Sequence, residues 1–197
     1  MCTTIIISLL ALTASQVIAQ YPPYYSNQSA PFNLYLRSSD SKLNGSAIVS
    51  CHEGAAIEGL CVAQAFNPPL SASTYNLNYS ANAVPDPELG YTGLLTFVLG
   101  PGTINIYSAM AIFPNIATNL GLPLLEPSED GTEVGFDQDN WMYIMGSSDH
   151  LTWQPYYRWY ACTTVTSYTY QLLNWVYGDG QPENPTCYKV DVLRVFI

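Results

Sequence analysis

Residues 156–197 read YYRWYACTTVTSYTYQLLNWVYGDGQPENPTCYKVDVLRVFI, and this stretch decides the fold. Three segments in it, 156–165, 168–177 and 188–197, are rich in Tyr, Val, Thr and Trp, the residues that favour pleated strands. The loop 178–185 between the last two is full of Gly, Pro, Asp and Asn, which form turns. The end of the chain therefore predicts three consecutive β-strands.

The last of these segments ends at Ile197 without a polar tail. Alternation places Tyr188, Val190, Val192 and Phe196 on one face of a strand. A free hydrophobic edge invites aggregation, so we expect this strand to be paired inside the sheet, and its removal to destabilise the fold.

The same pattern continues toward the N-terminus. Short β-rich segments occur at 32–37, 46–50, 74–79, 93–99, 103–111, 132–136 and 141–145, and turn residues occur at 42–45, 100–102 and 137–140. One short helix is expected, near 114–120, because Pro114 is tolerated in a first turn. About ten strands predict a single all-β domain, either an antiparallel β-sandwich or a closed barrel, and periodicity does not separate the two.

Composition limits the function. The 197 residues contain 15 Asp and Glu against 5 Lys and Arg, a net charge of −10, and only 10% of the residues are charged. Five cations do not make the basic stripe that phosphate binding needs, so nucleic acid is not an expected partner. The 16 Tyr and 4 Trp also argue against a disordered chain.

The N-terminus predicts export. Residues 1–19 have an apolar core, 5–12, that is too short to cross a bilayer, and small residues before Gln20 suit a signal peptidase. A membrane anchor is the alternative reading. An extended, poorly ordered Pro- and Tyr-rich lead-in is expected over 20–31, and the β-domain over 32–197. No other stretch suits a membrane span or a lipid-anchor signal, so we expect a mature protein without membrane attachment.

Cysteine usage agrees with an oxidising compartment. Cys2 leaves with the signal peptide, and the four that remain imply two disulfides. Three pairings are possible. We favour Cys51–Cys61 and Cys162–Cys187, because the members of each pair are near in sequence. Neither pair has the C-x2-C spacing of a zinc site.

Three N-x-[ST] sequons, at Asn27, Asn44 and Asn78, predict N-glycosylation of surface turns or strand ends. Chance occurrence is the alternative, above all at Asn44, because Asn44-Gly45 also suits a tight hairpin turn.

Three blocks of sequence carry a resemblance: CHEGAAIEGLC at 51–61, YRWYAC at 157–162, and NPTCYKVDVLRVFI at 184–197. From about Phe32 to the C-terminus the chain resembles a family of small, secreted, cysteine-containing, cell-wall-like proteins of filamentous fungi. The resemblance implies a secreted, β-rich fungal protein, and a wall location. That family has no established activity, so no catalytic residue is transferred.

His52 and Glu53 are one candidate for chemistry, with Glu58 nearby in the loop that a Cys51–Cys61 disulfide would hold. A histidine beside a carboxylate can shuttle protons near neutral pH. The favoured alternative is a Gly-rich loop in which these side chains satisfy backbone groups, because adjacent residues on an extended chain point apart. The stretch lacks the second His of the H-E-x-x-H zinc helix.

A second candidate is an acidic run without a single cation. It comprises Glu126, Glu129, Asp130, Glu133, Asp137 and Asp139. Such carboxylates can bind Ca²⁺ or act as a glycosidase pair, but 137–141 lacks the Gly and the final Glu of an EF-hand loop. We favour a solvated acidic hairpin, and predict no metal and no cofactor. The chain also has no G-x-S-x-G motif of a serine hydrolase.

The third candidate is the aromatic segment 153–160. On a strand, Tyr156, Arg158 and Tyr160 would face one way, and Tyr157 and Trp159 the other. One face would enter the core, and the other would offer a platform for sugar rings or an aromatic ligand, with Arg158 as a polar contact. The predicted ligand-binding residues are Tyr156, Arg158, Trp159 and Tyr160. The alternative is a purely structural stack of Arg158 on tyrosine.

These observations favour a non-catalytic secreted or wall-associated protein that binds polysaccharide, or a small aromatic ligand, through exposed aromatics. One alternative is an enzyme, acting on glycans or rearranging a small molecule in an aromatic pocket, with His52, Glu53 and Arg158 as catalytic candidates. Another is an effector that binds a host protein. Nothing in the sequence sets the oligomeric state.

Overall fold

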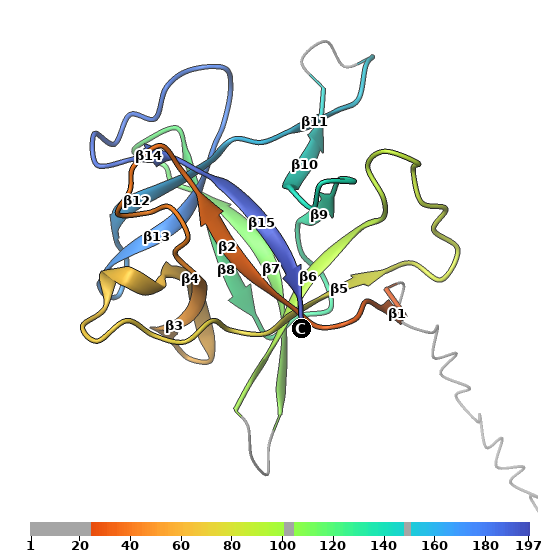
Figure 1. The fold of residues 1–197 in the computed structure, drawn as a ribbon, viewed down its shortest axis with the longest axis horizontal. Helices are drawn as coiled ribbons and strands as arrows, with labels where there is room; N and C mark the ends of the chain where they lie inside the picture. Colours follow the sequence, from red (N-terminus) through yellow and green to blue (C-terminus); the bar gives the residue numbers. More distant parts are fainter. Residues whose placement is uncertain (1–24, 101–104, 148–150) are drawn as a thin grey trace, which may run out of the picture.

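The computed structural model describes residues 25–100, 105–147 and 151–197 (Figure 1). The predicted signal peptide, 1–19, lies outside these ranges. The all-β prediction is confirmed: 54% of the structure is strand, and the described ranges contain no α-helix, only the 3-10 turn η1 (Ala63–Ala65). No helix among the described residues has the length and apolar character needed to cross a membrane.

Fifteen strands are described. They are β1 (Asn27–Gln28), β2 (Phe32–Arg37), β3 (Ile48–Gly54), β4 (Ile57–Val62), β5 (Tyr75–Tyr79), β6 (Thr92–Leu99), β7 (Ile106–Pro114), β8 (Leu120–Glu126), β9 (Glu133–Phe136), β10 (Met142–Gly146), β11 (Gln154–Tyr156), β12 (Trp159–Val165), β13 (Thr169–Val176), β14 (Tyr188–Lys189) and β15 (Asp191–Phe196). The first strand falls in the lead-in that we expected to be poorly ordered, where residues 27–28 pair with β5.

The strands form one antiparallel sheet that curls into a half-barrel. Its main path has ten strands in the order β11-β10-β9-β6-β7-β8-β4-β13-β12-β14. The remaining strands branch from this path: β3 pairs with β4, β5 pairs with β6, β1 and β2, and β15 pairs with β2. Figure 1 shows β2 and β15 side by side across the front of the curled sheet.

The C-terminal strand is paired with β2, as expected of an apolar terminus, but among the described residues its other edge has only the isolated bridge Trp141↔Leu193. Six residue pairs join β15 to β2, from Asp191↔Arg37 to Phe196↔Phe32. Val190 and Val192 are buried, but Tyr188 and Phe196 are each 50% exposed. The expected single face is therefore divided, because the chain changes partners at Val190: β14 pairs with β12, and β15 with β2.

The prediction of a short helix near 114–120 is wrong. Strand β7 continues to Pro114, and a turn follows in which the Asn115 side chain accepts a hydrogen bond from the Ala117 amide at 2.9 Å. The chain then returns as β8, a strand that the sequence analysis missed because Pro123 interrupts it. Pro123 lies opposite Ile112 in the β7–β8 ladder.

Strand β4 also differs from the sequence prediction, which favours a Gly-rich loop at this place. Strands β3 and β4 form a hairpin whose turn contains two residues at positive φ, Ala55 (47°) and Ala56 (64°). Left-handed backbone is uncommon for residues other than glycine, so the sequence gives little sign of this turn.

Both favoured disulfides are confirmed. Cys51–Cys61 joins β3 to β4, and Cys162–Cys187 ties β12 to the segment before β14. Cys61 and Cys162 are fully buried. Each closed loop is expected to contribute about 2–4 kcal/mol to the free energy of unfolding.

The β15 ladder provides a matched test of core packing. Val192 is 0% exposed and Val195 is 40% exposed on the same strand. Val192→Ala should lower the free energy of unfolding by about 2 kcal/mol, because it removes two buried methyl groups and leaves a cavity. Val195→Ala should change it by less than about 0.5 kcal/mol. Urea denaturation followed by circular dichroism measures both, and equal effects would contradict the burial of this strand.

Candidate functional site

A groove of about 450 Å³ lies between the β10–β11 hairpin and the end of β13, and we call it the Arg158 groove. Two of the predicted binding residues, Tyr156 and Arg158, line it together. The complete lining is Ile144, Met145, Gly146, Ser147, Tyr156, Arg158, Trp175, Tyr177, Gly178 and Asp179. Trp175, Tyr177 and Asp179 were not among the predicted residues, because they reach the groove from β13 and the loop after it, through the pairing of β13 with β12.

Local pairing positions the aromatic wall of the groove. Ile144 lies opposite Tyr156 in the short β10–β11 ladder. Nearby, a side chain at Gly146 would place its Cβ 3.1 Å from the Tyr156 ring, so the ring lies close against the bare glycine backbone. On the other side, Tyr177 follows β13 and is 41% exposed, and burial of its hydroxyl raises the pKa of Tyr177.

Arg158 is held from three sides. Its guanidinium lies over the Tyr156 ring, 4.3 Å from the centroid, and donates hydrogen bonds to the Gly178 carbonyl and the Asp179 carboxylate. Gly178 has φ of 70°, a conformation that glycine adopts without strain. The side chain of Asp179 is 83% exposed and that of Arg158 25%, so the carboxylate of this ion pair faces solvent at the edge of the groove.

The other aromatic residues of the segment have structural contacts. Trp159 is fully buried, meets Trp175 edge-to-face at 4.8 Å, and donates its indole N–H to the Met142 carbonyl at 2.8 Å. Tyr160 packs beside the Cys162–Cys187 disulfide, with the Lys189 ammonium 5.7 Å from its ring centroid. Neither lines the Arg158 groove.

The hairpin candidate forms a separate cluster. His52 lies opposite Glu58 in the β3–β4 ladder, and its Nδ1 is 3.6 Å from a Glu58 carboxylate oxygen. Glu53 is 7% exposed: one carboxylate oxygen accepts a hydrogen bond from the Thr166 hydroxyl, and the other has no partner among the described residues. Neither His52 nor Glu53 lines the Arg158 groove, so the three catalytic candidates do not meet in one pocket.

Glu58 is 5% exposed, and burial raises its pKa, although hydrogen bonds from His52 and Ser50 and the charge of His52 act in the opposite direction. The negative charge of Glu53 adds to the rise. The Glu58 carboxyl therefore keeps its proton to a higher pH than an ordinary glutamate does.

An aromatic row beside this cluster was missed by sequence reasoning. The rings of His52 and Tyr168 are 6.0 Å apart, those of Tyr168 and Tyr170 5.7 Å, and those of Tyr170 and Phe66 5.8 Å. The neighbouring rings are tilted by 36° to 49°, so the row is not a flat platform. The signal was the Tyr-x-Tyr pattern at 168–170: Tyr170 lies in β13, Tyr168 in the bend directly before it, and their rings are neighbours.

One carboxylate of the acidic run, that of Asp137, holds the turn. One oxygen of Asp137 accepts hydrogen bonds from the amides of Asp139 (3.0 Å) and Trp141 (2.9 Å), and the other accepts the Tyr157 hydroxyl at 2.7 Å. These bonds confirm the turn predicted at 137–140. Within the ranges that the structure describes, no three His, Cys, Asp or Glu side chains are grouped as a metal site would require.

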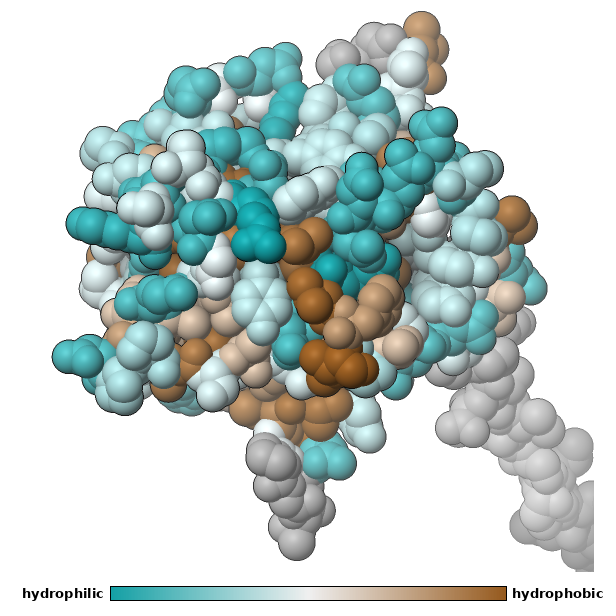
Figure 2. Space-filling model, in the orientation of Figure 1, coloured by the Kyte–Doolittle hydropathy of each residue, from teal (hydrophilic) through white to brown (hydrophobic). Residues whose placement is uncertain are grey.

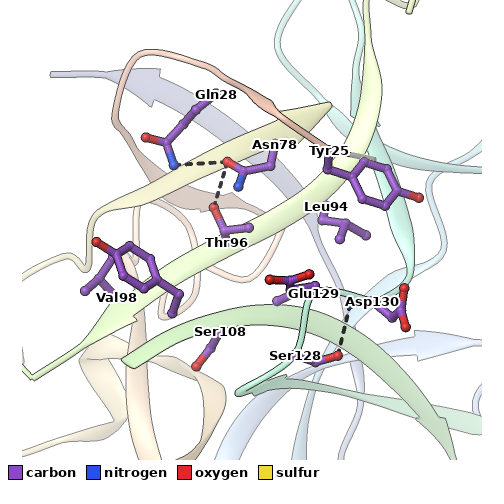
Figure 3. A pocket seen from close by; sticks show the side chains of 12 residues that line it. Tyr25, Gln28, Asn78, Leu94, Thr96, Val98, Ser108, Ser128, Glu129 and Asp130 are labelled. Atoms are coloured by element: carbon purple, nitrogen blue, oxygen red, sulfur yellow. Dashed lines mark hydrogen bonds between the residues drawn. The ribbon is translucent and has the colours of Figure 1, made fainter. Parts of the chain in front are cut away.

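A second cavity, of about 280 Å³, opens where β5, β6 and β7 lie beside the loop 128–130 (Figure 3). The amide oxygen of Asn78 accepts hydrogen bonds from Gln28 and Thr96 there. Glu129 and Asp130 line the cavity, and no Lys or Arg is among its lining residues.

The three predicted glycosylation residues differ in setting. Asn27 and Asn44 are exposed, and Asn44 lies in the predicted turn at 42–45, where its side chain accepts the Ser38 amide at 3.3 Å. Asn78 is half-buried in the cavity of Figure 3. Occupancy of the three sequons stays a prediction.

Comparison with known proteins places nearly the whole β-domain in one family. Residues 29–196 match the family model described as "Domain of unknown function (DUF7907)". The chain matches no curated protein and no solved structure.

The raised pKa of Glu58 predicts how stability depends on pH. The stability contributed by the protonated carboxyl is fully present below about pH 4 and is lost as the pH rises through the folded-state pKa. Glu58→Gln, which does not ionise, should therefore stabilise the protein more at pH 7 than at pH 4, as urea denaturation at both values would show. Glu129→Gln, an exposed change of equal charge, is the control. A larger gain at pH 4 would mean that the His52 contact outweighs burial.

Proposed function

The chain belongs to the family of the domain of unknown function DUF7907, and we propose from its geometry that it is a secreted surface protein that binds polysaccharide in the Arg158 groove. The observation that carries the proposal is the stack of Arg158 on Tyr156 at the wall of an open groove. The proposal extends to a cell-wall location in a filamentous fungus, on the strength of the sequence resemblance.

The groove has the two kinds of surface that sugars need. The apolar C–H face of a pyranose packs on an aromatic ring, and Tyr177, which is 41% exposed, offers such a ring, while Tyr156 supports Arg158 on the other side of the groove. Hydroxyl groups of a sugar bind planar, charged side chains in pairs of hydrogen bonds, and the Arg158–Asp179 pair presents a donor and an acceptor together. A groove of about 450 Å³ falls in the usual range for small-ligand sites.

Binding without catalysis is the reading that the arrangement supports best. Asp179 is the groove's carboxylate, and it is paired with Arg158. His52, the candidate proton carrier, belongs to the β3–β4 hairpin and does not line the groove. A general acid or base must lie within hydrogen-bond reach of the bond that reacts.

Two features support secretion. Both disulfides join cysteines that are predicted to remain after export, and disulfides persist in oxidising compartments. The predicted signal peptide and the exposed sequons at Asn27 and Asn44 agree with the same route.

Retention on insoluble chitin and on insoluble β-glucan tests the proposal. The protein should be retained on one of them, and Tyr156→Ala and Tyr177→Ala should each weaken binding by about tenfold or more, which corresponds to about 1.4 kcal/mol. Tyr107→Ala is the matched control, because Tyr107 is 69% exposed and lies outside the groove.

Failure to bind either polymer would remove the proposal's support. Equal losses in Tyr107→Ala and Tyr177→Ala would also contradict it, since binding would then not depend on the groove. Thermal unfolding of each variant checks that the fold is retained.

A further inference from the structure

A cavity of about 330 Å³ lies near the end of β15, and its chemistry differs from that of the Arg158 groove. It is lined by Ser29, Ala30, Leu77, Tyr79, Gly90, Tyr91, Phe136, Arg194 and Phe196. The two sites share no residue. In a chain of net charge −10, this cavity has one cation and no carboxylate among its lining residues.

Three phenylalanine rings surround the guanidinium of Arg194. The distances from its central carbon to the ring centroids are 4.4 Å for Phe136, 4.7 Å for Phe196 and 5.7 Å for Phe32. The Nε and Nη2 atoms of Arg194 donate to the side-chain oxygen of Asn140, at 3.0 and 2.8 Å. The side chain is therefore fixed in orientation before any ligand arrives.

Arg194 has no ion-pair partner among the residues that the structure describes. Burial lowers the pKa of its guanidinium to about 10, and the charge of Asp137 opposes part of that change. The group is therefore still charged at neutral pH. Its Nη1 atom donates to no acceptor in the described ranges, which leaves hydrogen-bonding capacity for an anion.

A partly buried cation without a direct ion-pair partner is costly, and a bound carboxylate offsets that cost through short, charge-assisted hydrogen bonds. The nearby tyrosines add a flat surface, because the Tyr79 and Tyr91 rings are stacked 4.2 Å apart with 18° between their planes. Phe196, which is 50% exposed, forms another part of the wall. Figure 2 shows hydrophobic side chains gathered where β15 ends.

We propose that this cavity binds a small aromatic carboxylate, with the carboxylate on Arg194 and the ring against the wall formed by Tyr91 and Phe196. The volume of about 330 Å³ limits the ligand to about one ring, because it is near the lower end of ligand sites. The proposal does not rest on polysaccharide binding in the Arg158 groove.

Three probes separate the contributions of charge and ring. 4-Hydroxybenzoate carries both, 4-hydroxybenzamide has the same ring without the charge, and acetate has the charge without the ring. Calorimetric titration of the whole protein should show saturable binding of 4-hydroxybenzoate, weakened about tenfold or more in each of the other two probes. Equal binding of the amide or of acetate would overturn the proposal, and so would the absence of saturable binding of 4-hydroxybenzoate.

Variants locate the site. Arg194→Gln should lower the affinity for 4-hydroxybenzoate by about tenfold or more. Arg37→Gln, an exposed change of equal charge on the partner strand β2, should leave the affinity unchanged. If both variants lose affinity equally, general electrostatic attraction explains the binding and the proposal fails.

Arg194 packs among three rings, so its replacement can disturb the fold. Tyr91→Leu keeps the cation and removes part of the aromatic wall. It should weaken the binding of 4-hydroxybenzoate and leave the binding of acetate unchanged. Unchanged binding of 4-hydroxybenzoate by a folded Tyr91→Leu protein would overturn the placement of the ring. Retention of Arg194→Gln on polysaccharide is a separate readout, so the two proposals fail independently.

Discussion

The antiparallel ladder between β2 and β15 is the constraint on which the rest of the structure depends. It joins residues from the two ends of the described chain, and it buries Phe32, Leu34 and Leu36 of β2 together with Val192. The same ladder places Arg194 beside the Phe32 and Phe136 rings. A pairing between such distant segments closes a long loop, whose entropy must be overcome before the contacts form, so we expect this ladder to limit the folding rate.

Both candidate binding sites follow from the way the sheet curls. In the Arg158 groove, Trp159 fills the core while its neighbour Arg158 stays at the surface, because successive residues point to opposite sides. The Trp159–Trp175 contact fixes β12 against β13, and Tyr177 follows directly from β13. In the Arg194 cavity, the turn residue Asn140 orients the guanidinium. The sheet thus positions an arginine beside aromatic rings at two places. Arg158 forms an ion pair with Asp179, whereas Arg194 has no ion-pair partner among the described residues.

Much of the fold could be predicted from local sequence, because strands alternate and turns use particular residues. The strands in the final third, the turn at 137–140 and both disulfides are of this kind. The errors have physical causes. Pro123 argues against a strand at 120–126, but the β7–β8 pairing accommodates it. The β3–β4 turn uses left-handed backbone at Ala55 and Ala56, which alanine does not signal in a sequence. In the candidate site, the Tyr156–Arg158 stack could be predicted, because residues two apart on an extended chain lie on the same side. The three phenylalanine rings around Arg194 could not be predicted, because they come from positions 32, 136 and 196.

The hydrogen bond from the Ile197 amide to the Pro31 carbonyl, at 3.3 Å, has a consequence for how this domain can be connected. The first and last residues of the β2–β15 ladder lie side by side, so the two ends of this ladder meet at one point of the surface. A domain of this kind can be inserted into a surface loop of another protein with little strain. The same proximity allows the two ends to be joined by a short linker and the chain to be reopened in the exposed loop 178–185, giving a circularly permuted protein with the same sheet.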